Sequence, residues 1–240
     1  ILQEHAEDLR RFLISCGEFV SVGKIYYRLL NQLVNVEEID LLDRRVFSEP
    51  HWEALRNSVA YGAYFHLKLQ LAFWRGEYEY VSAEYTKRRS LLETVHAFSI
   101  GDDNHFLNAI SLFNSALIDD PFSINSTFEY ANESVQYIYR VGAIYPPNFR
   151  HKVLLIQAEQ QRLKGDPCAS DTYQSAAIDA KENGFIQMYA LAHELHASYW
   201  QQQGRPDYVK HHIEKAFQGY HRWGCALKID QLQRRFGQYL

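Results

Sequence analysis

Lys164-Gly165-Asp166-Pro167 is the most informative segment of the sequence, because a similar segment returns as Gln203-Gly204-Arg205-Pro206. The two glycines are 39 residues apart (204 − 165 = 39). The same interval separates three further pairs of one physical kind: Ala158 and Ala197, Ala177 and Ala216, and Ile178 and Phe217. Glycine adopts the left-handed conformation that ends a helix, and proline begins the next helix without losing a needed hydrogen bond. Each stretch is therefore predicted to be the turn of a helical hairpin.

On both sides of these turns, apolar residues recur at three- and four-residue spacing along the whole chain, and no two-residue β-hairpin signal occurs. Helices are expected at about 3–15, 18–34, 51–75, 78–96, 104–118, 127–140, 148–164, 168–183, 185–203 and 206–223. The polar connections Ser99–Asn104 and Asp119–Thr127 are expected to be flexible loops. The paired alanines are expected where two antiparallel helices cross closely, and Ile178 and Phe217 where one hairpin packs on the next.

A helical unit of roughly 40 residues is close to the length of tetratricopeptide and HEAT repeats. The predicted fold class is therefore all-α, with antiparallel hairpins stacked as a tetratricopeptide-like right-handed solenoid. We expect residues 1–240 to form a single domain, with the clearest repeats at 148–183 and 185–223 and a capping helix at about 225–236.

The charge and cysteine content of the chain disfavour several classes of function. The chain has 240 residues, 25 Lys+Arg against 29 Asp+Glu, and a net charge of -4, so no global field attracts nucleic acid or an anionic membrane. Its three cysteines are far apart, which is typical of a reducing, cytoplasmic setting. No apolar stretch approaches the roughly 20 residues of a membrane span. Because the chain begins at Ile1, we expect it to be a piece of a longer polypeptide.

The C-terminal part resembles a known family. The most distinctive strings are Glu182-Asn183-Gly184-Phe185 and Tyr220-His221-Arg222-Trp223-Gly224, within a similar stretch of about 146–236. Residues of about 51–95 are similar but less sharply so. This pattern resembles the tetratricopeptide-like helical region of large bacterial hybrid signalling proteins, which combine a serine/threonine protein kinase, an AAA or STAND ATPase, a GAF domain and a sensor histidine kinase.

The resemblance implies that this chain is a non-catalytic scaffold or sensor segment. Its partners would be other domains of the same polypeptide or another protein, with no nucleic acid, membrane or cofactor. The sequence has no G-x-x-x-x-G-K-[ST] phosphate loop, kinase His-Arg-Asp loop or Asp-Phe-Gly motif, so kinase and ATPase chemistry would belong to the rest of the parent. The alternative function is that of a small-molecule effector sensor of an ATPase-coupled transcription regulator.

One string suggests an enzyme. His193-Glu194-Leu195-His196 places two histidines and a carboxylate on one predicted helix. A zincin motif needs histidines at i and i+4, whereas these lie at i and i+3 with no third ligand evident in the sequence. Packing or surface histidines are therefore favoured over a metal-dependent enzyme. His211 and His212 are adjacent, about 100° apart on a helix, and are not expected to share a metal.

Four residues are candidate interaction or ligand contacts: Glu194, Tyr220, Arg222 and Trp223. Glu194 is expected either to contact a ligand or, by the favoured interpretation, to form a hydrogen bond or ion pair between helices, for example with an arginine of the following helix. An arginine beside aromatic rings can hold a carboxylate, which is the functional interpretation of Arg222. The structural interpretation is that Tyr220 and Trp223, at i and i+3, close the core of the last hairpin.

Overall fold

The computed structural model describes residues 59–93, 100–116 and 120–240, together with 2–5, 8, 33 and 34, and all regular elements of residues 59–240 in these ranges are helices. The predictions for 3–15, 18–34 and the start of the helix at 51–75 fall largely outside the described residues. The helices are α4 (Val59–Trp74), α5 (Tyr78–Glu93), α6 (Ile100–Ser115), α7 (Pro121–Ile144), α8 (Pro146–Leu163), α9 (Ala169–Glu182), α10 (Ile186–Gln202), α11 (Pro206–Trp223), α12 (Ala226–Phe236) and the 3-10 helix η3 (Gly237–Tyr239).

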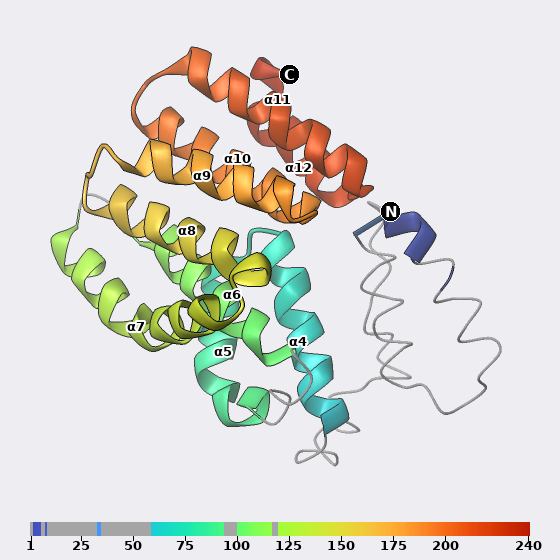
Figure 1. Cartoon of the computed structure of the whole chain (residues 1–240), viewed down its shortest axis with the longest axis vertical. Helices are drawn as coiled ribbons and strands as arrows, with labels where there is room; N and C mark the ends of the chain where they lie inside the picture. Colours follow the sequence, from blue (N-terminus) through green and yellow to red (C-terminus); the bar gives the residue numbers. More distant parts are fainter. Residues whose placement is uncertain (1, 6–7, 9–32, 35–58, 94–99, 117–119) are drawn as a thin grey trace.

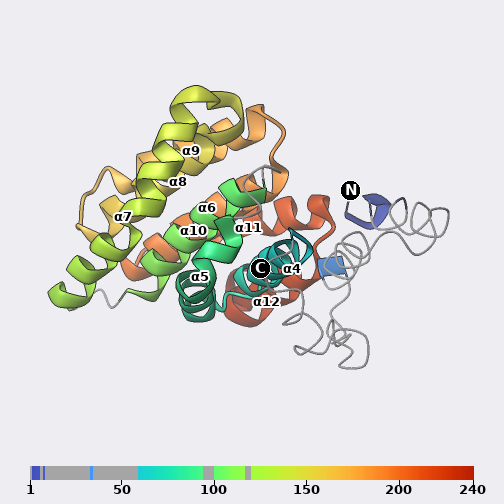
Figure 2. The same cartoon turned by 90° about the horizontal axis from the view of Figure 1, so that it is seen from below.

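These helices stack in chain order (Figure 1). Each packs on the next from α4 to α12, and the alternate helices α4, α6, α8 and α10 also contact one another in turn. Seen from below, α7, α8 and α9 lie on one side and α4, α11 and α12 on the other, with α6 and α10 between them (Figure 2). The expectation of an all-α chain of stacked helices is therefore confirmed for the described residues.

The predicted turns have the expected chemistry. Gly165 and Gly204 adopt positive φ values of 69° and 63° after α8 and α10. The turn after α8 is closed by a hydrogen bond from the Asp166 backbone N–H to the carbonyl of Gln161 at 2.9 Å. Pro206 is the first residue of α11. The repeat interval thus corresponds to one helical hairpin.

Small residues mark the close crossings within this part of the stack. Each of the paired alanines 158, 197, 177 and 216 has at most 1% of its surface exposed. Gly219 of α11 lies so close to α10 that an added Cβ would come within 2.8 Å of the Cβ of Ala190. The expectation for Ile178 is wrong, since its side chain is 47% exposed on the outside of α9.

The two predicted loops are also wrong. Residues 100–104 form the first turn of α6, and residues 121–127 form the first two turns of α7. The physical reason at α7 is a local one: Asp120 caps the helix by accepting a hydrogen bond from the Phe122 N–H at 3.0 Å, and Pro121 is its first residue. Together they extend α7 to 24 residues.

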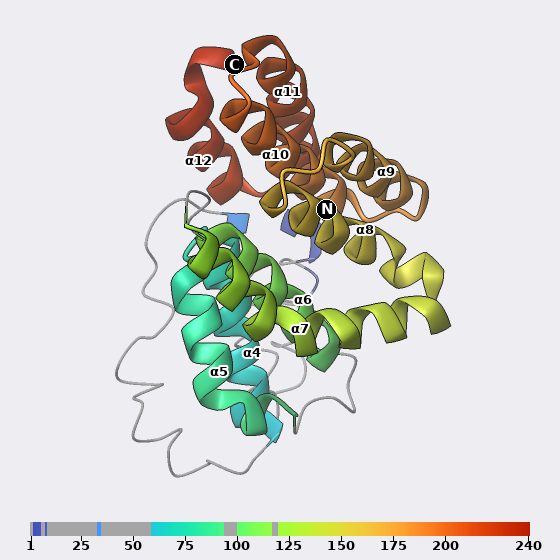
Figure 3. The same ribbon diagram turned by 90° about the vertical axis from the view of Figure 1, so that its left-hand side faces the viewer.

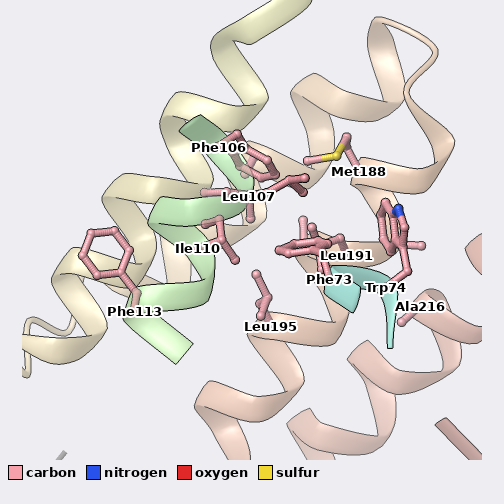
Figure 4. Packing of buried hydrophobic residues seen from close by; sticks show 14 of the residues in the cluster. Phe73, Trp74, Phe106, Leu107, Ile110, Phe113, Met188, Leu191, Leu195 and Ala216 are labelled. Atoms are coloured by element: carbon pink, nitrogen blue, oxygen red, sulfur yellow. The ribbon is translucent and has the colours of Figure 1, made fainter. Parts of the chain in front are cut away.

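The end of α4 packs against helices both near it and far from it in the sequence. Phe73 and Trp74, 1% and 8% exposed, insert among side chains of α6, α10 and α11, including Ile110, Leu191 and Ala216 (Figure 4). The interior of the C-terminal hairpins is therefore covered by a helix that lies more than a hundred residues earlier in the sequence. Among the described helices, none combines the length and apolar character needed to cross a bilayer.

Candidate functional site

Three of the four candidate residues lie together where α10, α11 and α12 meet. Glu194 is in the middle of α10, and Tyr220 and Trp223 are in the last turn of α11. Residues at i and i+3 share a helix face, so Tyr220 and Trp223 both point inward and are 0% and 8% exposed. Arg222 lies on the other side of the turn and is exposed, so the structure does not bring it to this group.

Glu194 is the centre of a buried charged network. The Tyr220 hydroxyl donates to its Oε2 at 2.6 Å, and the Lys228 ammonium of α12 donates to its Oε1 at 2.8 Å. Lys228 is only 2% exposed and also lies 5.3 Å from the centroid of the Tyr220 ring. Burial, followed by the nearby Glu194 carboxylate, raises the pKa of Tyr220 well above its ordinary value. This network joins three helices, and its cation is a lysine rather than the arginine suggested by the sequence.

A second carboxylate is held in the same way one hairpin earlier. The Tyr173 hydroxyl of α9 donates to Glu159 Oε1 at 2.6 Å, and the Arg162 guanidinium donates to Glu159 Oε2 at 2.7 Å. Arg162 also donates to the backbone carbonyl of Phe113 in α6 at 2.8 Å. Sequence reasoning missed this network, although the i, i+3 spacing of Glu159 and Arg162 was a visible signal.

Trp223 leads from the Glu194 network to a cleft of about 220 Å³. Its indole lies 4.9 Å from that of Trp74, centroid to centroid. The cleft is lined by residues of α4, α6, α8, α10 and α11 and of the turn before α10: Gln70, Phe73, Trp74, Asp103, Phe106, Leu107, Lys152, Phe185, Gln187, Met188 and Trp223. Five of these eleven residues are aromatic, two are aliphatic and four are polar.

The polar end of the cleft carries charges of both signs. Lys152 of α8 forms an ion pair with Asp103 in the first turn of α6. The side chain of Lys152 is 12% exposed and that of Asp103 is 38% exposed. Phe185, Gln187 and Met188 bring the N-terminus of α10 to the same cleft, and no side chain caps that N-terminus. Such an arrangement can bind a small molecule that has a polar group at one end and an apolar remainder.

The predicted histidine pair gains a third member that the sequence did not reveal. His193, His196 and His212, named here the histidine trio, are 1%, 2% and 4% exposed between α10 and α11. The Nδ1 atoms of His193 and His212 are 3.0 Å apart, and the rings of His196 and His212 lie 3.8 Å apart, centroid to centroid. His211 points outward and is exposed.

Burial is the main cause that lowers the pKa of each member of the trio, to about 3 for His193, about 2 for His196 and about 4 for His212. The rings are therefore neutral near pH 7, and the Nδ1 contact of His193 and His212 is one hydrogen bond between neutral imidazoles. Across residues 59–93, 100–116 and 120–240, no group of three His, Cys, Asp or Glu side chains is placed to hold a metal ion.

Comparisons with known proteins do not add a relative to this picture. The chain matches no family model, no curated protein and no solved structure.

Proposed function

We propose that this chain is a non-catalytic helical-repeat segment that binds protein, within a multidomain bacterial signal-transduction protein of the kinase, ATPase and histidine kinase type. The protein that it binds would be another domain of the same polypeptide or a separate protein. The 39-residue hairpin unit with its glycine turns supports the further proposal of a tetratricopeptide-like right-handed solenoid.

One observation carries the binding proposal: large apolar side chains on the outer side of α7. We name Phe122, Tyr130, Ile144 and the adjoining Tyr145 the α7 stripe; they are 79%, 71%, 63% and 58% exposed. At 100° per residue, the three helical members fall within about 80° of one another and span about 33 Å along the axis. α7 lies on the outside of the stack, at the front of the view in Figure 3.

Single exposed apolar residues are common on proteins, but several aligned on one helix face indicate an interaction surface. A few residues supply most of the binding energy at protein interfaces, and tyrosine and tryptophan are enriched among them. Glu133 also lies on this side of α7, paired with Arg89 of α5, so the stripe has a charged neighbour typical of an interface rim.

Site-directed photocrosslinking in cells tests this proposal. A photoreactive phenylalanine analogue placed at Tyr130 is expected to crosslink to one defined protein segment, and the Phe122→Ser substitution is expected to reduce the yield. Glu182, exposed at the end of α9, is the matched control position. Equal crosslinking from positions 130 and 182 would contradict the proposal.

A second candidate function, that of a small-molecule sensor, is favoured by the cleft beside Trp223. Its aromatic walls and its Asp103–Lys152 pair are the kind of lining that fixes the orientation of a small ligand. Ligand-dependent thermal stabilisation that disappears when the cleft is filled by Met188→Trp would support this function, and stabilisation that persists in that variant would contradict it.

A further inference from the structure

The cleft joins an apolar chamber to opposite charges within a small volume. Phe106 of α6 and Met188 of α10 face it beside the end of α4 (Figure 4). Its volume of about 220 Å³ is below the roughly 300–1,000 Å³ of pockets for drug-sized ligands. At about 30 Å³ per water molecule, it corresponds to about seven waters. The size suits a metabolite no larger than a single amino acid.

Two independent features make one end of the cleft attractive to an anion. The first is the ammonium group of Lys152, whose side chain is largely buried. The second is the start of α10, where Phe185 is the N-cap residue and provides no side-chain cap. The N–H groups of Ile186 and Met188 donate to the carbonyls of Gly184 and Phe185 at 3.1 and 3.0 Å, which leaves the N–H of Gln187, a residue that lines the cleft, for a ligand. The first N–H groups of a helix have no acceptor within the helix, and the helix dipole makes this end positive. A carboxylate at this point would receive donors from both.

Asp103 decides what else the ligand must carry. Its carboxylate uses Oδ1 to accept from Lys152, and a carboxylate has further lone pairs for other donors. A ligand with only a negative charge would be repelled by Asp103. A ligand that also has an ammonium group converts the single Asp103–Lys152 pair into two pairs of opposite charge, because each protein charge then faces a ligand charge.

We propose that the cleft binds a free α-amino acid with a large apolar side chain. Its carboxylate meets Lys152 and the N-terminus of α10, its ammonium group meets Asp103, and its side chain packs against Phe106 and Met188. This proposal rests on the second candidate function, that of a sensor, and names its ligand class. The cleft shares no residue with the α7 stripe. A negative result for amino-acid binding would therefore leave the protein-binding proposal unaffected, and the reverse also holds.

Isothermal titration calorimetry of the whole chain with L-phenylalanine, L-leucine and L-methionine tests the ligand class. We expect saturable binding at one site for at least one of them. For a binding amino acid, analogues that lack one charge are expected to bind at least tenfold more weakly; for L-phenylalanine these are 3-phenylpropanoate and phenethylamine. No saturable binding of the three amino acids, or equal binding of 3-phenylpropanoate and L-phenylalanine, would overturn the proposal.

Variants place the binding in the cleft. Asp103→Asn is expected to weaken amino-acid binding at least tenfold, and Met188→Trp to abolish it by filling the chamber. Asp171→Asn on the exposed face of α9 is the matched control and should bind like the unaltered chain. Circular dichroism confirms that each variant is folded. If Met188→Trp fails to fold, Asp103→Asn alone decides, and unchanged affinity in either folded variant would overturn the assignment.

Discussion

Replacing Lys228 by methionine tests the buried network around Glu194. The substitution keeps an unbranched side chain, one atom shorter, and removes its charge, which leaves the Glu194 carboxylate buried with the Tyr220 hydroxyl as its donor. At 2.8 Å and an effective dielectric constant of about 20, the two charges attract by about 6 kcal/mol before desolvation is subtracted. Removing one partner of such a buried pair costs about 3–5 kcal/mol of stability.

Urea unfolding at pH 7, followed by circular dichroism, measures this loss as a lower midpoint with an unchanged m-value. The double substitution Lys228→Met with Glu194→Leu is expected to recover part of the loss, because an apolar pair does not leave a buried charge unpaired. The exposed pair of Lys210 and Glu214 at 4.0 Å is the matched control, and Lys210→Met should leave the midpoint unchanged. A cost for Lys228→Met as small as that of the control would refute this reasoning.

Two further predictions concern α10 and α11. Because the folded-state pKa values of the histidine trio lie below the ordinary value, the unfolded chain binds more protons than the folded chain as the pH falls from about 6.5 to about 2. Stability is therefore present above pH 6.5 and lost through this window, by about 2 kcal/mol per histidine at pH 5. Urea titrations at pH 7 and 5 should show a smaller loss of stability between the two pH values for His212→Gln than for His211→Gln, whose residue is exposed. An equal loss in the two variants would contradict the contribution of the histidine trio to the pH dependence. Gly219→Ala should lower the free energy of unfolding by about 1–3 kcal/mol, because the added methyl group meets Ala190. Gly237 has open space around it, so Gly237→Ala should change the free energy of unfolding by no more than about 0.5 kcal/mol in the same assay. Equal losses in the two variants would contradict the close crossing of α10 and α11.

The hairpin architecture was predictable because its signals are local. A glycine such as Gly204 ends a helix by its own conformational freedom, and the next helix begins at Pro206, two residues later. The start of α7 was also signalled locally, by Asp120 and Pro121, but the polar residues that follow obscured it. Local chemistry therefore located the ends of most described helices, and failed where polar composition resembled a loop.

The candidate site was only partly predictable because it depends on distant segments. Glu194, Tyr220 and Trp223 could be selected from their types and spacing, but nothing near them in sequence indicates that Trp74 closes over Trp223. Lys228 reads as a surface residue of a terminal helix, yet it is buried because Glu194 lies opposite. Such pairings are set by how distant helices pack together, which periodicity alone does not specify.

Covalent labelling of tyrosines, in cells and in the isolated chain, tests the proposal that the α7 stripe binds protein. Tyr130 is 71% exposed and Tyr208 of α11 is 42% exposed, so Tyr130 should label faster in the isolated chain. We predict that labelling of Tyr130 in cells falls at least fivefold, whereas labelling of Tyr208 does not change. An unchanged ratio of Tyr130 to Tyr208 labelling in cells would contradict the account.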